Sequence, residues 1–517
     1  REIMGIKRYF AKSDNTITNA YEENLTTRGT ASNMGASDIL EVFSIYGQAN
    51  SSSAEKSRAL IKFDITASTN SVSADRTAGT IPASGSVSFF LRLYNTPHGQ
   101  TLPKSYTMDV SAVSGSWTEG TGLDMEMYKD KGSSNWINRI TSQSAGDHAW
   151  AAEGGDYYSD ASSSFSASFD GGTENIEVDI TTLVEQWLNS AGNVLGSKAD
   201  EGVGVFISNT YEAAARSYYT KKFFGRGTEF YFKRPCVEAR WDSSTEDDRG
   251  NFFYSSSLAT AAENLNTLYL YNYFRGRLRN IPGVGTGNVY VGIFSGSSDD
   301  TAPSGSLLTL VADGTHVRSA LTTVVTGGYV STGIYSASVA LTAAATPVST
   351  LYDVWFSGGL GAAPPGSTQY YTGSITPTVL KPSTVAPSNE YMVSITNLKN
   401  IYRSDETGRF RVYTRQKDWS PTIYTKAVAT PQVQVIESGS YEIHRVVDDL
   451  KVISYGTGST NHTVMSYDAS GSYFDLDMGM LETGYMYGIK LAFYNEDVLE
   501  WVEQPETFKF KVESRQS

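Results

Sequence analysis

Asp475 and Asp477 stand two residues apart in the segment 474–480, and carboxylates at this spacing occur in cation-binding loops. An EF-hand loop also needs an oxygen ligand at its fifth position, glycine at the sixth and glutamate at the twelfth. A loop that began at Asp468 would have Gly471 at the fourth position instead. Apolar residues alternate with the two aspartates, as on a half-buried strand. The sequence therefore predicts exposed, metal-free aspartates on the solvent side of a strand.

Histidine, cysteine and serine form no recognisable catalytic pattern in this chain. The five histidines, none at a metal-ligand spacing, are His98, His148, His316, His444 and His462. No Gly-x-Ser-x-Gly elbow is present, and the single cysteine, Cys236, can form neither an intrachain disulfide nor a cysteine zinc site. Glu119 and Asp124 could meet in space as the two carboxylates of a glycosidase, but a turn is the interpretation that the sequence favours there. We predict that the chain is not an enzyme, with no catalytic residue, cofactor or metal site.

The segment 216–235 combines cationic and aromatic side chains and is the predicted partner or glycan surface. The residues singled out in it are Arg216, Tyr218, Tyr219, Lys221, Lys222 and Arg226. Stacking together with positive charge could bind sugars, anionic polysaccharide or single-stranded nucleic acid. The alternative is a strand pair that turns at 225–227, with its cations facing solvent or an acidic neighbouring subunit.

The composition is that of a folded, mainly β protein. Hydrophobic residues make up 40% of the 517 residues and charged residues 19%, with 33 tyrosines and 47 glycines, which favours strands and turns over helices. The net charge of −14 argues against nucleic acid as a partner, because binding to phosphates needs a basic surface. No run of about 18 apolar residues occurs, so no membrane span is predicted. Residues 1–15 contain no apolar signal-peptide core.

Three blocks, 1–242, 243–385 and 386–517, are separated by polar segments at 243–250 and 381–387, which we interpret as hinges. Every block contains strands with an apolar residue at every second position. These alternating positions are Val87, Phe89, Leu91 and Leu93; Val203, Val205 and Ile207; Val289, Val291 and Ile293; Phe410 and Val412; and Phe508, Phe510 and Val512.

One short helix is predicted in the first block, after residue 180. Leu183, Val184, Trp187 and Leu188 would form its apolar face, with Asp179 or Thr181 capping its start and Gly192 its end. It is expected to pack across a sandwich.

The first block resembles the DNRLRE-type domain, a jelly-roll β-sandwich of cell-surface and extracellular proteins. The resemblance rests on RYFAKSDNTITNA (8–20), RALIKFDI (58–65), SWTEG (116–120), IEVDITTLVEQWLN (176–189) and RPCVEARWD (234–242). These segments cover nearly the whole block in the expected order. The resemblance implies a jelly-roll sandwich, and members of the wider group act as carbohydrate-binding modules.

The last block contains Leu481, Gly484 and Tyr487 in the order L-x-x-G-x-x-Y, which resembles the tyrosine corner of fibronectin-type and other immunoglobulin-like sandwiches. That resemblance implies a buried Tyr487 ring whose hydroxyl bonds to the backbone. The middle block has similar pieces at 331–341 and 352–358, and we expect it to be immunoglobulin-like as well. The predicted fold class is all-β: a jelly-roll sandwich with one short helix, followed by two immunoglobulin-like sandwiches.

The string of blocks resembles virion proteins of tailed bacteriophages, particularly large marine phages, on residues 234–282, 410–425 and 466–493. The resemblance implies a structural protein of the tail, baseplate or neck, which folds in the host cytoplasm and lies on the external surface of the particle. Its partners would be other virion proteins, including copies of itself in a symmetric assembly. The alternative is a glycan-binding receptor-recognition protein or cell-surface adhesin, which would bind a host surface glycan through the N-terminal sandwich.

Overall fold

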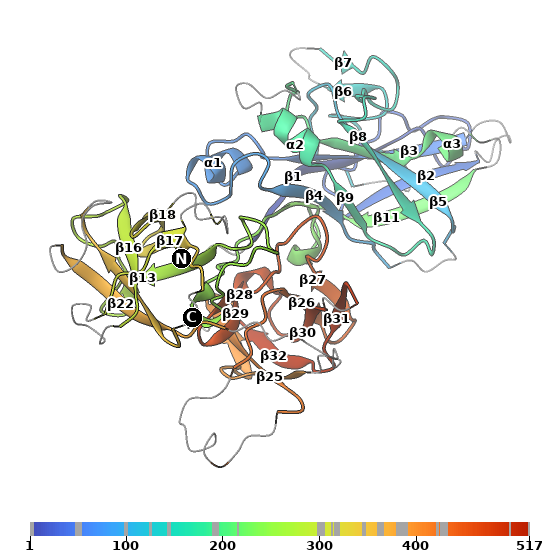
Figure 1. Ribbon diagram of the computed structural model, residues 1–517. Coiled ribbons are helices and arrows are strands. Elements are labelled where there is room, and N and C mark those ends of the chain that lie inside the picture. The colour runs from blue at the N-terminus through green and yellow to red at the C-terminus, as the bar shows by residue number, and fades with distance from the viewer. Residues whose placement is uncertain are drawn as a thin grey trace. The chain divides into compact units, whose positions relative to one another are not determined.

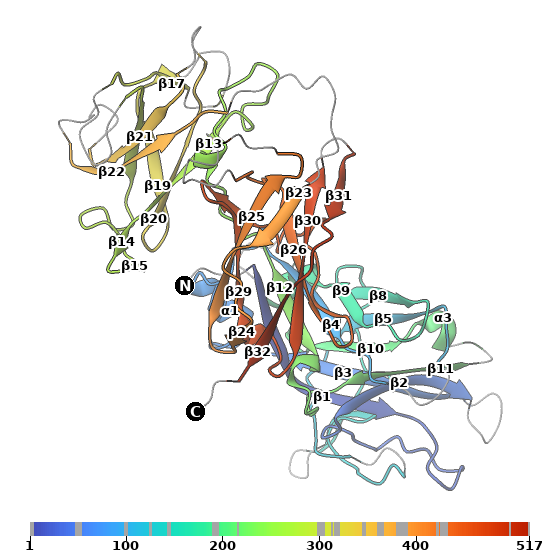
Figure 2. The ribbon, with the colours of Figure 1, turned by 90° about the horizontal axis from the view of Figure 1, so that it is seen from below.

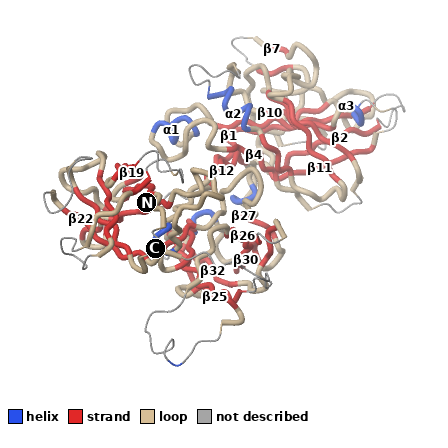
Figure 3. Tube along the Cα trace, in the orientation of Figure 1, coloured by secondary structure: helices blue, strands red, loops and turns tan. Residues whose placement is uncertain are grey.

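The computed structural model (Figure 1) divides into two compact units, residues 1–243 with 458–462 and residues 244–457 with 463–517. Strands dominate both units, and helices are few and short (Figure 3). The structure describes residues 5–46, 54–97, 102–123, 127–141, 146–188, 196–212, 214, 217–296, 305–311, 314, 321–343, 348–358, 367–378, 391–419, 423, 433–495 and 498–514. The predicted linker 381–387 lies outside these residues. Within them, no helix has the length and apolar character that crossing a membrane requires.

Eight strands of the first unit build a two-sheet sandwich. In chain order they are β1 (Ile6–Thr18), β3 (Ala54–Phe63), β4 (Ser88–Leu93), β5 (Tyr106–Ala112), β8 (Ser164–Phe169), β9 (Ile176–Asp179), β10 (Val203–Ile207) and β12 (Cys236–Arg240). The hydrogen-bonded order is β1-β12-β4-β9 in one sheet and β3-β10-β5-β8 in the other. If the eight strands are lettered B to I in chain order, the first sheet has the order B-I-D-G and the second C-H-E-F. This is the strand order of a jelly roll. The sequence prediction of this fold is therefore confirmed.

β1 belongs to both sheets of this sandwich. Its first residues pair with β12 and its residues from Ala11 onward pair with β3, with a register shift between Ala11 and Ser13 at the start of the β3 pairing. Such an irregularity lets a strand bend from one sheet into the next. Two further strands, β2 (Ile39–Tyr46) and β11 (Tyr218–Phe224), pair with each other and extend the second sheet beyond β3. β6 (Asn138–Ile140) and β7 (His148–Ala149) form a small separate hairpin.

The predicted alternation is confirmed in the core of this sandwich. Phe89, Leu91 and Leu93 on β4 are fully buried, because side chains two residues apart on a strand face the same side. The predicted helix is α2 (Thr181–Leu188), and Leu183, Val184 and Trp187 on it are buried in the same core. The Asp179 carboxylate accepts a hydrogen bond from Thr181 N–H, while Gly192 lies outside the described residues. Two shorter helices, α1 (Val72–Thr77) and α3 (Asn209–Glu212), occur in addition.

The first sandwich of the second unit is immunoglobulin-like in its strand order. Its strands are β13 (Asn266–Tyr271), β16 (Val289–Phe294), β19 (Val325–Ser331), β20 (Ile334–Val339), β21 (Leu351–Phe356) and β22 (Gln369–Ile375). In the immunoglobulin lettering, the strands β13-β20-β19 correspond to B-E-D, and the strands β16-β21-β22 correspond to C-F-G. β19 also pairs with β16. Short pairs are formed by β14 (Tyr273–Phe274) with β15 (Arg277–Leu278), and by β17 (Leu310–Val311) with β18 (Leu321–Thr322).

The second sandwich of this unit is also immunoglobulin-like. Its strands are β23 (Tyr391–Ile395), β24 (Ile401–Arg403), β25 (Thr407–Gln416), β26 (Gly439–Arg445), β27 (Leu450–Ile453), β28 (Ser466–Asp468), β29 (Gly471–Asp477), β30 (Met486–Asn495), β31 (Glu500–Glu503) and β32 (Phe508–Glu513). Figure 2 shows these strands gathered around β30. The sheets β23-β25-β29-β28 and β24-β32-β30-β26-β27 read A-B-E-D and A′-G-F-C-C′. All three sandwiches of the predicted fold class are thus present.

Candidate functional site

The predicted surface segment is strand β11 and the loop that follows it. β11 pairs with β2 from Tyr218 opposite Ile45 to Phe224 opposite Ile39. The chain turns at Gly225, forms the short 3-10 helix η1 (Tyr231–Lys233), and enters β12 in the other sheet. The predicted turn at 225–227 therefore joins two sheets and not two paired strands. Arg216 lies outside the described residues.

Lys221 is completely buried, so the prediction that it lies on a surface is wrong. Its ammonium donates to Asn95 Oδ1 at 2.7 Å, to Gly172 O at 2.8 Å and to Glu174 O at 2.7 Å. Burial of the ammonium lowers the pKa of Lys221 to about 8, and the Glu174 charge opposes this shift. Because three acceptors satisfy its three N–H groups, Lys221 ties β11 to the chain segments around residues 95 and 173.

The other described cations of the predicted site also form ion pairs within the first unit. Lys222 Nζ lies 3.1 Å from the Glu41 carboxylate. Arg226 makes two hydrogen bonds to Glu119, from Nε to Oε1 at 2.9 Å and from Nη2 to Oε2 at 3.0 Å. Glu119 is therefore part of an ion pair, and Asp124 lies outside the described residues. The interpretation of these cations as a solvent-facing basic surface is not supported.

Asp14 lies beside the Arg226–Glu119 pair and is 1% exposed. Its carboxylate accepts a hydrogen bond from Arg226 N–H, and its own N–H donates to Glu119 Oε1 at 2.8 Å. Burial raises the pKa of the Asp14 carboxyl to about 7, with the hydrogen bond from Arg226 acting in the opposite direction. The SWTEG segment thus serves to join β1 to the loop after β11.

An aromatic group at Tyr218 and Tyr219 remains accessible in the predicted segment. Tyr218 is 64% exposed, and its ring stacks on Tyr219 with centroids 4.9 Å apart and an interplanar angle of 18°. The Tyr211 ring meets Tyr219 edge-on at 4.9 Å. A flat, half-exposed pair of this kind can contact the C–H face of a sugar ring.

Tyr487 occupies the corner position that the motif predicts. Its ring is 1% exposed, and its hydroxyl donates to Glu482 O at 2.8 Å. Gly484, between the two residues, has φ +90° and donates its N–H to Val512 O at 2.7 Å. A left-handed φ is accessible to glycine without steric cost, which explains its place in the motif. This arrangement closes one end of the last sandwich.

The aspartates of β29 have structural partners. Arg409 of the neighbouring β25 binds Asp475 through two hydrogen bonds, at 2.9 and 2.8 Å, and the Asp475 side chain is only 15% exposed. Asp477 accepts a hydrogen bond from Gly479 N–H and caps the short 3-10 helix η3 (Met478–Met480). The prediction of two exposed aspartates is therefore wrong: a cross-strand arginine covers Asp475, and Asp477 is half-buried.

The segment 244–250 is a structured junction between the two sandwiches of the second unit, and the boundary between the two units falls just before it, at 243/244. Tyr467 of β28 pairs with it through backbone hydrogen bonds to Thr245 and Asp247, and the Tyr467 hydroxyl donates to Asp248 at 2.8 Å. Arg249, in the 3-10 helix η2 (Asp248–Gly250), donates two hydrogen bonds to Asp353 of β21, at 3.2 and 2.8 Å. Asp353 is fully buried. The segment 244–250 is therefore bound by Tyr467 of one sandwich and by Asp353 of the other.

The β14–β15 hairpin carries exposed residues that were not among the predicted site residues. Arg275 and Gly276 have φ +50° and +74°, the two left-handed residues of a tight two-residue hairpin turn. Tyr273 and Phe274 are 57% and 52% exposed, and Figure 2 shows the hairpin at one end of its sandwich. A signal existed in the sequence, because Arg275, Arg277 and Arg279 are the only charged residues between 263 and 299.

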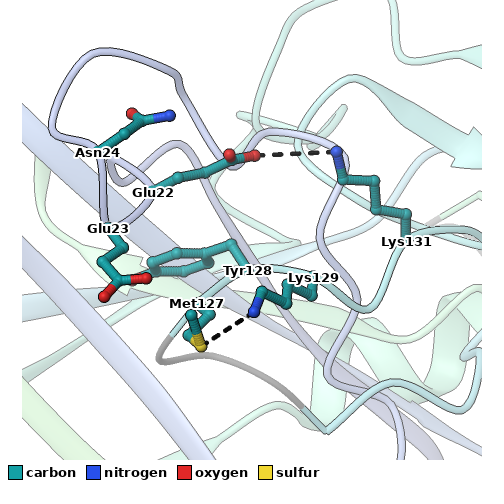
Figure 4. Close-up of a pocket in the computed structure, with 7 residues that line it drawn as sticks. All are labelled: Glu22, Glu23, Asn24, Met127, Tyr128, Lys129 and Lys131. Carbon is teal, nitrogen blue, oxygen red and sulfur yellow. Dashed lines mark hydrogen bonds and ion pairs between the residues drawn. The ribbon is translucent and has the colours of Figure 1, made fainter.

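A hollow of about 250 Å³ lies on the first unit (Figure 4). Its lining residues are Glu22, Glu23, Asn24, Met127, Tyr128, Lys129 and Lys131. Lys131 lies 3.8 Å from Glu22, and Lys129 contacts the Met127 sulfur at 3.2 Å. Two acidic and two basic side chains offset each other here, so the hollow does not favour a ligand of either charge.

Comparison with known proteins assigns no family. No family model and no curated protein matches the sequence. Among solved structures the chain is similar to one described as "Marsupial T cell receptor", with 10% identity over 52% of this chain and 72% of that chain. The TM-score of 0.17 is too low to support an argument about fold or function. The fold assignment therefore rests on the strand order of the three sandwiches.

Proposed function

We propose that this chain is a structural component of a tailed-phage virion, an appendage or adaptor of the tail, baseplate or neck that acts through protein–protein interfaces and not as an enzyme. The observation that carries the proposal is how its buried charged side chains are used. Arg249 and Asp353 join η2 to β21, and the buried Lys221 ties β11 to other segments of the first unit. Charged side chains that bind other segments of the same chain stabilise the shape of the protein.

The junction at 244–250 gives this role a mechanical basis. An ion pair with 10% and 0% exposed side chains, together with the Tyr467 contact, restrains the two sandwiches of the second unit. A part that transmits load or position in a particle needs such restraint. The placement in a phage is supported by the resemblance of residues 234–282 and 410–425 to virion proteins.

Exposed large side chains provide candidate contacts with other virion proteins and with copies of the chain. Tyr218 is 64%, Val447 73% and Met486 48% exposed. Aromatic residues and methionine are enriched in protein interfaces. We expect the chain to fold in the host cytoplasm and to assemble on the external surface of the particle in several copies.

The proposal predicts that purified particles contain this chain in a fixed ratio to the major capsid protein. Quantitative mass spectrometry of gradient-purified particles measures that ratio, and deletion of the gene should give particles that lack a tail, baseplate or neck part in electron micrographs. Restoring the gene on a plasmid is the control. Particles that are complete and infectious without the chain would refute the proposal.

A second candidate function is recognition of a host glycan by the N-terminal sandwich, and the exposed Tyr218–Tyr219 pair favours it. Replacing Tyr218 with alanine should then weaken binding to host surface polysaccharide about fivefold, since a stacked aromatic contact contributes about 1 kcal/mol. Tyr231→Ala is the control, because Tyr231 is 48% exposed but packs on Phe10. Isothermal titration calorimetry measures the difference. Equal binding by wild type and Tyr218→Ala would exclude this site.

A further inference from the structure

The β14–β15 hairpin concentrates positive charge on a chain that is acidic overall. Arg275, Arg277 and Arg279 are all exposed, and no carboxylate among the described residues forms an ion pair with any of the three. Electrostatic fields at a protein surface are screened over about 10 Å at 0.1 M salt. The hairpin therefore presents a local positive potential even though the net charge of the chain is −14.

One face of the hairpin combines these guanidiniums with an aromatic ring. Phe274 pairs directly with Arg277 across the hairpin, so their side chains lie on the same face, and Arg279, two residues further along, shares it. The Arg275 and Arg279 guanidiniums lie 5.3 and 5.5 Å from the Phe274 ring centroid. Arg277 and Arg279 are separated by about 7 Å along the strand.

Hydrogen bonds at the base hold this face in place. Asn272 N–H donates to Gly333 O at 2.8 Å, and Arg279 N–H donates to Asn272 O at 3.0 Å. Gly333 has φ +76°, and a Cβ atom there would lie 2.6 Å from Arg279 N, so only glycine permits this approach. A preorganised surface loses less conformational entropy when it binds a ligand.

The geometry points to this hairpin as a binding site for an acidic polysaccharide. The forked guanidinium group binds a carboxylate through two parallel hydrogen bonds, and the exposed Phe274 ring can contact the C–H face of a sugar. Two guanidiniums beside one ring, with Arg277 paired opposite Phe274, match a linear chain in which sugar rings and carboxylates recur. This binding adds a function to the structural role and does not depend on membership of a particle.

Other ligand classes fit the hairpin less well. Small molecules bind in concave sites, and this hairpin presents its residues on an exposed turn. Duplex DNA has one charge per about 1.7 Å and would be repelled more strongly by an acidic chain than a polyuronate with wider charge spacing.

The test is affinity electrophoresis of the full chain in gels that contain alginate, a linear polyuronate, with neutral dextran as the reference polymer. The variant carries Arg275→Gln, Arg277→Gln and Arg279→Gln. A control variant with the same net charge carries Lys104→Gln, Lys129→Gln and Lys509→Gln, three exposed cations elsewhere. Phe274→Ala tests the ring separately, and circular dichroism confirms that each variant is folded.

Alginate should retard the wild type and the lysine control, dextran should retard neither, and added salt should weaken the retardation. The arginine variant should bind alginate about tenfold more weakly or worse, because each exposed ion pair contributes a factor of about two to five. Equal retardation of the arginine variant, or none of the wild type, would overturn the proposal. Equally tight binding of a single-stranded oligonucleotide, or self-association that the arginine variant abolishes, would assign the hairpin to nucleic acid or to a second copy instead.

Discussion

Replacing Arg58 with alanine is expected to lower the free energy of unfolding of the first unit by about 3–5 kcal/mol. Arg58 on β3 donates to both carboxylate oxygens of Glu212, at 3.1 and 2.7 Å, and to Gly154 O at 3.0 Å. The side chains of Arg58 and Glu212 are 16% and 6% exposed. Alanine would leave the Glu212 carboxylate buried without its main counterion, and that loss dominates the cost.

Packing adds to this effect, because the Arg58 guanidinium lies 5.3 Å from the Trp136 ring and 5.0 Å from the Phe206 ring. Lys12→Ala is the matched control, since Lys12 and Asp64 form an ion pair whose side chains are 59% and 41% exposed, worth less than about 1 kcal/mol. Scanning calorimetry of the full chain should show a midpoint lower by about 10 °C for Arg58→Ala. Equal midpoints for both variants would mean that this buried pair contributes no net stability.

Replacing Arg249 with alanine is expected to destabilise the second unit by about 3–5 kcal/mol and to open the junction at 244–250. Asp353 is fully buried and accepts from Arg249 and from Trp355 Nε1, the latter at 2.6 Å. Without Arg249 its charge would lose its ion-pair partner. The same substitution removes the hydrogen bond from Arg249 Nη2 to Tyr269 O, at 3.1 Å.

Two measurements separate stability from restraint at this junction. Urea unfolding reports the free energy, and cleavage by a glutamate-specific protease after Glu246, an exposed residue, reports opening of the segment. The control is Arg409→Ala, since Arg409 and Asp475 are 33% and 15% exposed and lie within one sheet. That variant should lose less stability and show unchanged cleavage at Glu246. If Arg249→Ala were cleaved no faster than wild type, η2 would not restrain the two sandwiches.

Features that depend on local order along the chain could be predicted from the sequence. Val203, Val205 and Ile207 are buried on β10 because alternation within one strand determines which face is apolar. The helix at 181–188 and the Tyr487 corner depend on residues within about ten positions of each other. Tyr487 bonds to the backbone of a residue five positions earlier, so its motif is complete in a short stretch.

Features that depend on a distant partner could not be predicted in this way. Lys221 alternates with Tyr219 and Phe223 and therefore faces inward, but its acceptors are at residues 95, 172 and 174. The acidic segment 244–250 has the composition of a hinge, and its restraining partners are Asp353 and Tyr467. Asp475 is covered by Arg409, 66 positions away in the sequence.

The sequence by itself thus determined the strands, the all-β class and the tyrosine corner, since these follow from periodicity and short motifs. Only the tertiary structure decided which charged residues are exposed. A lysine or aspartate has the same polarity wherever it stands in the sequence, and its cost of burial depends on partners that folding brings within hydrogen-bonding distance. The cations of 217–235 found such partners, and the arginines of the β14–β15 hairpin have none among the described residues.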